Sequence, residues 1–254
     1  MLKKIEKNKK VIIIPDIHQD AYFLAKVMAN KACDNFDAIV FLGDYFDTHN
    51  EEKNTVSKTV DVLKYYHYLY SHKDVNQKVY WLVGNHDLTY LEDYNHRTRY
   101  SKQFHCGGYS KERSSYITKN LNIGFWADTE IAIQVGDYIL SHAGFHQNHF
   151  KPFLNVFGQI SEINRIYKHN FLNPSAPEIS WLWNIGRHRG GNSSVGSPIW
   201  LDFDFEFKDM VDFPQIVGHT AGNSVKKIGN SVCLDCLQTS FGILQNNQLQ
   251  TFLV

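Results

Sequence analysis

The 254-residue chain lacks an excess of either charge, has few cysteines and contains no long apolar run. Its 26 lysines and arginines balance 26 aspartates and glutamates, so the overall charge does not point to nucleic acid or to an anionic membrane surface. No stretch approaches the roughly 20 apolar residues of a membrane-spanning helix. The apolar run that follows the lysine-rich residues 1–10 is too short for a secretory signal. We therefore expect a cytoplasmic protein that makes no membrane contact.

The chain has only four cysteines, and two of them, Cys233 and Cys236, form a CxxC pair. Such a pair can indicate zinc binding or redox chemistry. Residues 232–237 are typical of a strand, however, and side chains three positions apart on a strand point to opposite faces. We interpret the cysteines as buried or partly buried thiols in a reducing compartment. Nothing in the sequence is typical of a linker, so we expect one domain over residues 1–254.

Five short apolar runs are each followed by side chains that can bind metals. The runs span residues 11–14, 38–42, 79–83, 138–140 and 215–217, and they lead into Asp16, His18, Asp44, Asn85, His142 and His219. In α/β folds, ligand groups collect on the loops at the carboxyl ends of buried strands. A mixture of carboxylates, imidazoles and a carboxamide is expected for manganese, iron(II) or zinc. A single aspartate or histidine is often a cap or a core residue, but the five blocks together favour a catalytic two-metal centre.

The spacing of the other residues predicts the fold class. Strands and helices alternate in the first third of the chain, which predicts parallel βαβ units. We expect helices over residues 20–35, 55–71 and 152–170, a hairpin over 130–141, and an antiparallel meander from 214 onward that closes a second sheet. On the second helix, His67 is expected in the core rather than at a metal. The prediction is an α/β fold, a mixed β-sandwich flanked by helices.

The five blocks resemble, in the same order, the motifs of the calcineurin-like metallophosphoesterase superfamily. The blocks are Asp16-Ile17-His18, Gly43-Asp44-Tyr45-Phe46-Asp47, Gly84-Asn85-His86-Asp87, Ser141-His142-Ala143-Gly144 and Gly218-His219-Thr220. The resemblance covers the chain from Asp16 to about Asp235. It implies that Asp16 and His18 hold one metal ion, that Asp44 bridges two, and that Asn85, His142 and His219 complete the second. Manganese is the expected metal, with iron(II), zinc or nickel as alternatives.

The resemblance also implies a mechanism. A hydroxide bridging the two ions would attack phosphorus without a protein nucleophile. His86 would contact the phosphoryl group or the leaving oxygen, and Asp47 would orient His86. Asp87 is expected to support the loop through hydrogen bonds.

Two departures from the motifs bear on the substrate. Asp47-Thr48-His49 stands where related Ser/Thr protein phosphatases have Asp-Arg-Gly, so their phosphate-gripping arginine is missing. Thr220-Ala221 follows His219, so the second histidine of the nuclease and cyclic-nucleotide branches is missing too. The pattern favours the bacterial or phage-type protein-phosphatase-like and dinucleoside-tetraphosphatase-like branch.

Two groups of cations are candidates for binding substrate. Arg187 and Arg189 could clamp phosphate in a bidentate manner, or lie in an ordinary exposed loop. Arg97 and Arg99 belong to a basic, aromatic segment, and we expect residues 88–126 to form an insertion that covers the substrate. A solvated loop with its own aromatic core explains the same composition. Other histidines near the motifs, His49, His146 and His149, are expected at the surface or behind the ligands.

The sequence thus predicts a two-metal phosphoesterase that hydrolyses a phosphomonoester or phosphoanhydride bond. The expected substrate is a phosphoprotein or a nucleotide. The basic segment keeps open a nuclease or phosphodiesterase that acts on nucleic-acid ends, although the missing second histidine argues against it. A retired scaffold that only binds a partner is disfavoured because every expected ligand is present.

Overall fold

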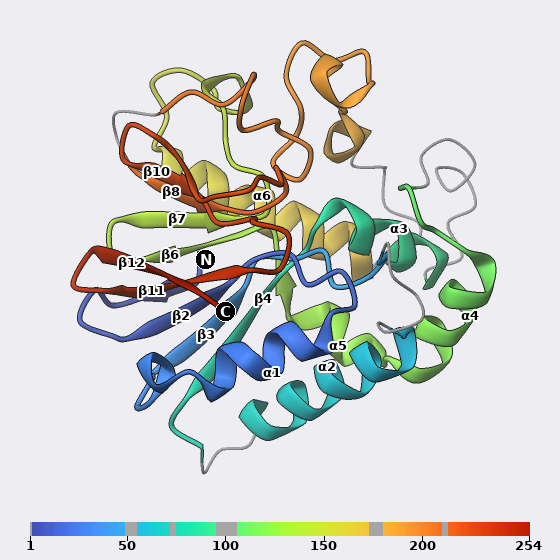
Figure 1. The fold of residues 1–254 in the computed structure, drawn as a ribbon. Coiled ribbons are helices and arrows are strands. Elements are labelled where there is room, and N and C mark those ends of the chain that lie inside the picture. The colour runs from blue at the N-terminus through green and yellow to red at the C-terminus, as the bar shows by residue number, and fades with distance from the viewer. Residues whose placement is uncertain (1, 49–54, 72–74, 95–105, 173–179, 210–212) are drawn as a thin grey trace.

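Two six-stranded sheets face each other, with helices on the outside (Figure 1). The computed structural model describes residues 2–48, 55–71, 75–94, 106–172, 180–209 and 213–254. One sheet has the order β12-β11-β2-β3-β4-β5 and the other the order β1-β6-β7-β8-β10-β9. The sheets share a core, and the chain forms the single-domain mixed α/β sandwich that its sequence predicts.

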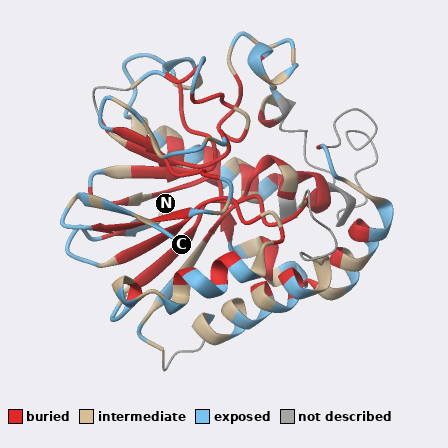
Figure 2. Cartoon of the chain, in the orientation of Figure 1, coloured by how far each residue is buried: buried red, intermediate tan, exposed pale blue. Residues whose placement is uncertain are grey.

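The first sheet contains the parallel strands expected from the start of the chain. These are β2 (Val11–Ile14), β3 (Ala38–Phe41), β4 (Lys78–Leu82) and the short β5 (Thr129–Glu130). All side chains of β2 and β3 are buried, because helices cover one face and the second sheet covers the other (Figure 2). Val11 and Ile13 pack between the sheets, whereas Ile12 and Ile14 pack toward the helices.

Helices α1 (Ala21–Ala29) and α2 (Val56–Ser71) lie below the first sheet in Figure 1. The predicted helix over residues 20–35 is too long, because Asn30 leaves the helical conformation and its side chain caps the 3₁₀ turn η1 (Lys31–Cys33). On α2, His67 is only half-buried and pairs with Asp128 at 2.9 Å, so its expected place in the core is wrong.

The second sheet begins with β1 (Lys4–Ile5) and the antiparallel hairpin of β6 (Ala132–Val135) and β7 (Tyr138–Ser141). The predicted strand 130–135 is split, since residue 130 ends β5 in the other sheet. At the connection from β5 to β6, the side chain of Asn164 accepts hydrogen bonds from the backbone N–H groups of Ile131 and Ala132. It thereby satisfies the backbone where the chain crosses over.

The antiparallel meander predicted from residue 214 onward is confirmed only in part. The strands on either side of the turns at residues 229–230 and 246–247 pair in an antiparallel manner, but the strands of this region are divided between the two sheets. Strand β8 (Gln215–Val217) runs parallel to β7 and to β10 (Ser231–Cys233), whereas β9 (Lys226–Ile228) pairs with β10 in an antiparallel manner. Strands β11 (Ser240–Gln245) and β12 (Gln248–Leu253) join the first sheet, where β11 pairs with β2. The last strands therefore tie the C-terminus to the N-terminal half.

Most of the described part of residues 88–126 is helical. The helices of this part are α3 (Asn85–Tyr94), α4 (Lys111–Asn120) and α5 (Ile123–Asp128). The side chains of Ser110 and Asn122 cap α4 and α5 by accepting hydrogen bonds from backbone N–H groups. Large side chains such as Phe125 and Trp126 are fully buried, so this segment belongs to the core.

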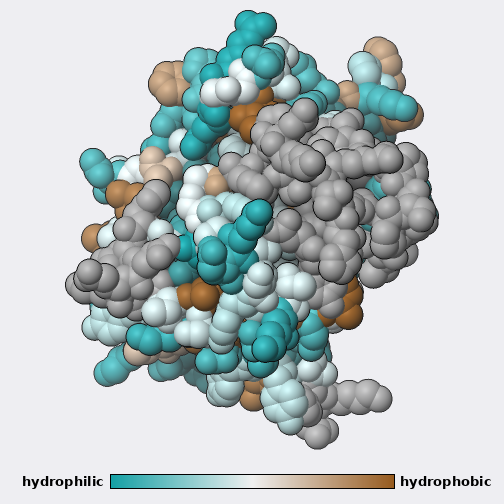
Figure 3. Space-filling model, turned by 90° about the vertical axis from the view of Figure 1, so that its right-hand side faces the viewer, coloured by the Kyte–Doolittle hydropathy of each residue, from teal (hydrophilic) through white to brown (hydrophobic). Residues whose placement is uncertain are grey.

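The remaining described helices include α6 (Val156–Leu172), which begins four residues later than the predicted helix 152–170. Short 3₁₀ turns cover Gln147–His149 (η2), Ser180–Trp183 (η3) and Arg187–Arg189 (η4). Figure 3 views the side that carries α3 and α4, where the described surface is mostly hydrophilic with scattered apolar residues. Among the described helices, none is long and apolar enough to cross a membrane.

The four cysteines are all buried and unpaired, as their composition and spacing predict. Cys233 ends β10, and the chain leaves the strand before Cys236. The predicted strand 232–237 is therefore too long, and the CxxC spacing spans a strand end.

Candidate metal centre

The six expected ligands lie together where strands of both sheets end. Asp16 and His18 follow β2, Asp44 follows β3, Asn85 opens α3 after β4, His142 follows β7 and His219 follows β8. All are buried apart from His18, whose side chain is 21% exposed. The turns after the strands are tight, since His18, Asp44 and His219 all have positive φ angles, between 45° and 67°. Such backbone strain in residues with a Cβ is typical of functional sites.

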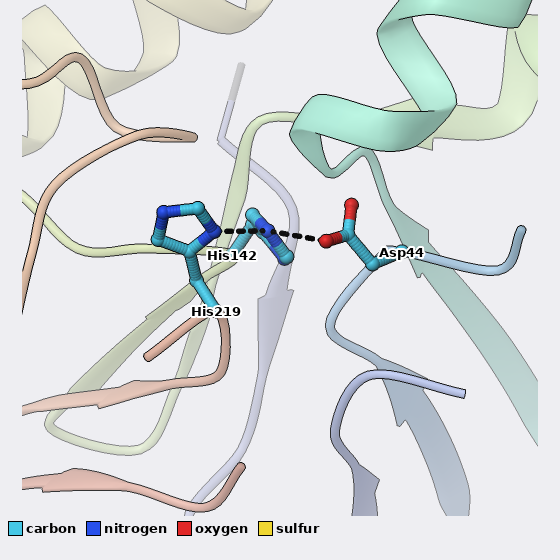
Figure 4. A group of neighbouring side chains, drawn as sticks. All are labelled: Asp44, His142 and His219. Carbon is cyan, nitrogen blue, oxygen red and sulfur yellow. Dashed lines mark hydrogen bonds and ion pairs between the residues drawn. The ribbon is translucent and has the colours of Figure 1, made fainter. Parts of the chain in front are cut away.

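One group of candidate ligands comprises Asp44, His142 and His219, whose donor atoms all lie within 4.8 Å of one another (Figure 4). Nε2 of His142 lies 3.3 Å from Oδ2 of Asp44 and 3.1 Å from Nδ1 of His219. The carboxamide oxygen of Asn85 lies 3.0 Å from that same Nε2. Four residues from four loops therefore direct polar atoms at one point.

A second group comprises Asp16, His18 and Asp44. Nε2 of His18 lies 3.9 Å from a carboxylate oxygen of each aspartate. Asp16 is fixed by the backbone N–H of His219, which lies 3.0 Å from one carboxylate oxygen and 3.1 Å from the other. Asp44 is common to both groups. The two sets of possible metal-ligating atoms are therefore adjacent and share one carboxylate.

Backbone carbonyls orient two of the histidines. Nδ1 of His142 lies 3.0 Å from the carbonyl oxygen of Leu42, and Nδ1 of His18 lies 3.0 Å from that of Phe46. Donation from Nδ1 leaves the lone pair of Nε2 directed into the cluster. This is the tautomer that a metal-ligating histidine needs.

Asn85 gives the clearest test of whether a cation fits. Its oxygen faces the nitrogens of His142 and His219 and, at 3.3 Å, Oδ2 of Asp44, while its amide nitrogen donates to the sulfur of Cys106. In a metal-free protein the amide would gain hydrogen bonds by rotating through 180°. The orientation with the oxygen inward becomes favourable when a cation lies among these lone pairs, so the donor set fits a divalent metal.

The charges around the centre also favour a bound cation. Burial disfavours a charged imidazole at His142, but Asp44 and Asp16 outweigh burial and raise its pKa to about 9. Burial and the neighbouring Asp235 raise the pKa of Asp16 well above its ordinary value. Both shifts reflect a strongly negative, buried site, where a metal-free protein holds protons and a divalent cation would replace them.

Asp87 braces the loops that carry the ligands, as the sequence predicts. Its buried carboxylate accepts hydrogen bonds from the backbone N–H groups of Asp44, Tyr45 and Gly84, at 2.7–2.9 Å. The loops approach so closely that a Cβ on Gly84 would lie 2.1 Å from a carboxylate oxygen of Asp44. Only glycine fits at position 84 without moving the shared carboxylate.

His86 and Asp47 form a pair beside the ligands. Nδ1 of His86 lies 2.8 Å from Oδ2 of Asp47, whose side chain is fully buried. The His86 side chain is 18% exposed, and its ring meets that of His18 edge-on, with the centroids 5.2 Å apart. The structure thus brings together both residues that the sequence predicts for proton transfer.

The four candidate arginines have different outcomes. Arg97 and Arg99 lie outside the described residues, and Arg187 is exposed on η4. Nε of Arg189 lies 2.8 Å from Asp202, and its terminal nitrogen donates to the hydroxyl of Thr220, next to His219. Arg189 therefore supports the loop of a candidate ligand.

Among the other histidines, His49 lies outside the described residues. His146 and His149 form a turn on η2, in which Nδ1 of His149 accepts a hydrogen bond from the N–H of His146. Nε2 of His149 donates to the carbonyl of Gly196 at 2.8 Å. These hydrogen bonds give both side chains a structural role in the turn, and His146 is buried rather than at the surface.

Three further residues contact the site without having been singled out from the sequence. Tyr90 and Arg113 both bind Asp47, and Cys106 binds the side chain of Asn85. Arg113 is one of several basic residues between positions 95 and 119, and nothing in its spacing marks it as buried. Only the helical periodicity of α4, which places Arg113 on the same face as the buried Ile117, could have indicated it.

Comparison with known proteins adds a family and a fold. The sequence profile of the calcineurin-like phosphoesterase family matches residues 9–223. No curated protein sequence matches the chain. The structure is similar to a cold-active protein-tyrosine phosphatase of the psychrophile Shewanella sp., with a TM-score of 0.67 and 18% identity over 100% of this chain and 80% of the other.

Two further structures are similar at lower identity. A protein serine/threonine phosphatase from Saccharomyces cerevisiae gives a TM-score of 0.55 with 13% identity over 100% of this chain and 84% of the other. A putative diadenosine tetraphosphatase gives 0.51 with 14% identity, over 100% and 98%. At these identities the likeness establishes a common fold.

Proposed function

The chain belongs to the calcineurin-like phosphoesterase family of metal-dependent hydrolases, and on that premise we propose that it is a two-metal phosphatase that cleaves a phosphomonoester or phosphoanhydride bond. The observation that carries the proposal is the convergence of lone pairs from Asn85, His142, His219 and Asp44, with Asp16 and His18 completing a second pocket around the shared carboxylate. Both groups found among the described residues combine carboxylate oxygens with imidazole nitrogens.

In this proposal Asp16, His18 and Asp44 hold one divalent cation, and Asp44, Asn85, His142 and His219 hold the other. When bound, the cations supply Lewis-acid activation of water and of the phosphoryl group. Manganese suits the mixture of nitrogen and oxygen donors, as do iron(II), zinc and nickel.

The protein's own contribution to the reaction is proton transfer by His86. A water oxygen forms a bond to phosphorus, the bond from phosphorus to the leaving oxygen breaks, and its electron pair departs on that oxygen. The leaving oxygen then takes a proton from Nε2 of His86, while Asp47 holds Nδ1 and so fixes the ring. The attacking water gives up one proton to solvent, and His86 regains a proton from solvent before the next turnover. Because Asp47 is buried, water does not compete with His86 for this carboxylate.

The proposed substrates are phosphoproteins or nucleotides. Structures of similar fold are protein phosphatases and a putative diadenosine tetraphosphatase, which supports this range without deciding within it. Arg187 is our candidate for contacting the phosphate, because it is exposed on the same short turn as Arg189, which touches the His219 loop. Residues 88–126 are proposed to border the substrate, since Cys106 and Arg113 already contact the site.

We place the enzyme in the cytoplasm, where its four unpaired, buried thiols would stay reduced. Retention of the protein in the cytosolic fraction of its native host is the direct check.

Metal reconstitution tests the proposed function. The protein is stripped with a chelator, reloaded with single metals and assayed on p-nitrophenyl phosphate. We expect activity to depend on the added metal and to be highest with manganese. A rate that is the same with every metal and with none would contradict the proposal. A panel of phosphopeptides, mononucleotides, dinucleoside polyphosphates and end-phosphorylated RNA then identifies the substrate class.

A further inference from the structure

We propose that Arg113, carried by α4, is a positioning residue that sets the geometry of the His86–Asp47 pair. The inference rests on the proposed function of His86 as proton donor and extends it to a residue outside the sequence motifs. Its consequence is specific: loss of Arg113 should impair proton transfer to the leaving group and leave metal binding intact.

The contacts of Arg113 converge on Asp47. Nη1 of Arg113 donates to Oδ1 of Asp47 and to the carbonyl oxygen of Gly108, and it lies 3.4 Å from the hydroxyl of Tyr90. That hydroxyl also donates to Oδ1 of Asp47. The opposite oxygen, Oδ2, binds His86. Each carboxylate oxygen therefore has its own partners, and the plane of the carboxylate is fixed from behind.

Burial makes this arrangement stiff. The Arg113 side chain is 6% exposed and that of Asp47 is fully buried, so the ion pair is shielded from water. A buried carboxylate without a cationic partner is costly, which ties Asp47 to Arg113 rather than to solvent. The ring of Tyr109 stacks on that of Tyr90, with the centroids 5.5 Å apart, and buttresses the second donor.

The same burial argues against direct contact with substrate. The guanidinium contacts Asp47, Tyr90 and Gly108, and Asp47 in turn binds His86. The two N–H bonds of Nη1 lie in the fixed plane of the guanidinium and can point at Asp47 and at the Gly108 carbonyl in set directions, whereas the freely rotating ammonium of lysine holds them less rigidly. Arg113 thus links the fold of the insertion to the orientation of His86.

Leaving-group dependence provides a readout that a purely structural role would not change. Phenolate is a poorer leaving group than p-nitrophenolate and needs its proton more in the transition state. Arg113→Gln should therefore lower kcat for phenyl phosphate about tenfold more than kcat for p-nitrophenyl phosphate, within the range of a general acid's contribution. KM and the metal content should stay as in the wild type.

Three matched variants complete the test. Lys64→Gln removes a positive charge from an exposed position of α2, outside the insertion, and should change neither rate. Arg113→Lys keeps the buried charge, and it should fold and show a smaller loss with the same substrate preference. In an Asp47→Asn background, Arg113→Gln should add less than about a twofold further loss, because the two residues act as one unit.

Failure of the proposed phosphatase activity and failure of the role of Arg113 give different results. Absence of metal-dependent hydrolysis in the wild type would count against the proposed function. Given an active wild type, equal losses on both phosphate esters, or fully additive losses with Asp47→Asn, would overturn the role of Arg113. If Arg113→Gln does not fold, the ratio of the two rates in Arg113→Lys decides the question alone.

Discussion

The metal-ligand cluster and the His86–Asp47 pair are neighbours, yet different parts of the molecule hold them. The cluster is fixed by backbone groups at strand ends, namely the carbonyls of Leu42 and Phe46 and the N–H groups bound by Asp87. The pair is fixed by side chains from α3 and α4. Metal binding and proton transfer should therefore be separable by mutation.

The largest effect is expected from the residue that both donor groups share. Asp44→Ala should lower activity by about 10³-fold or more, because losing the cations removes several kcal/mol of Lewis-acid stabilisation. Elemental analysis should show that bound metal is lost together with activity. Asp61→Asn, which alters an exposed carboxylate on α2, is the control and should retain both. Full metal content in Asp44→Ala would break the assignment of the cluster.

His86→Gln tests the role of the His86–Asp47 pair. Loss of the proton donor should reduce kcat about 10²–10³-fold on a substrate with a poor leaving group. Metal content should be unchanged, since His86 lies beside the donor groups and not within them. Steady-state kinetics and elemental analysis on one preparation decide this, and a parallel loss of metal would show that the two regions are not separable.

Cys106 belongs to the insertion but contacts Asn85 of the metal-ligand cluster, so it tests whether the insertion also contributes to metal binding. Its sulfur accepts a hydrogen bond from the amide of Asn85 and so keeps the amide oxygen directed inward. Cys106→Ala should weaken metal affinity about 10–100-fold, the usual cost of losing such a supporting contact. Titration with manganese measures the change. Cys33→Ala, another buried cysteine remote from the ligands, should leave the affinity as it is.

The smallest effect on activity is expected from His149, which binds the backbone of His146 and the carbonyl of Gly196. Burial lowers the pKa of His149 to about 4, below its ordinary value of 6.5. The unfolded chain therefore takes up the proton first as the pH falls, and stability is lost between pH 6.5 and 4. We expect about 2 kcal/mol less stability at pH 5 than at pH 7.

Urea unfolding at the two pH values measures this loss, and His149→Gln should reduce the difference without changing activity at neutral pH. The structural reason is that a second proton on His149 would sit on Nδ1, which accepts the N–H of His146. An undiminished pH difference in the variant would show that another group is responsible.

Features that depend on a few adjacent residues could be predicted from the sequence. Asp16, Asp44 and His142 could be predicted because a short apolar run followed by a polar residue marks the end of a buried strand. The hairpin of β6 and β7 follows from a glycine turn between two apolar runs. These features depend on a few adjacent residues, and the topology of an α/β sheet brings them together.

Features that depend on distant partners could not be predicted. The pairing of β11 with β2 joins residues from opposite ends of the chain, and nothing in residues 240–245 indicates which sheet they enter. The helices of the insertion were missed because their buried positions include polar residues such as Arg113 and Ser114. The contact of Arg113 with Asp47 spans 66 positions, and only the folded structure reveals it.

The central claim is that two cations share the carboxylate of Asp44. Crystals soaked in manganese, with anomalous diffraction recorded at the metal edge, test it most directly. The account predicts two peaks about 3.5–4 Å apart on either side of Asp44, one beside Asp16 and His18 and the other beside Asn85, His142 and His219. A single peak, or peaks only at sites away from Asp44, would contradict it.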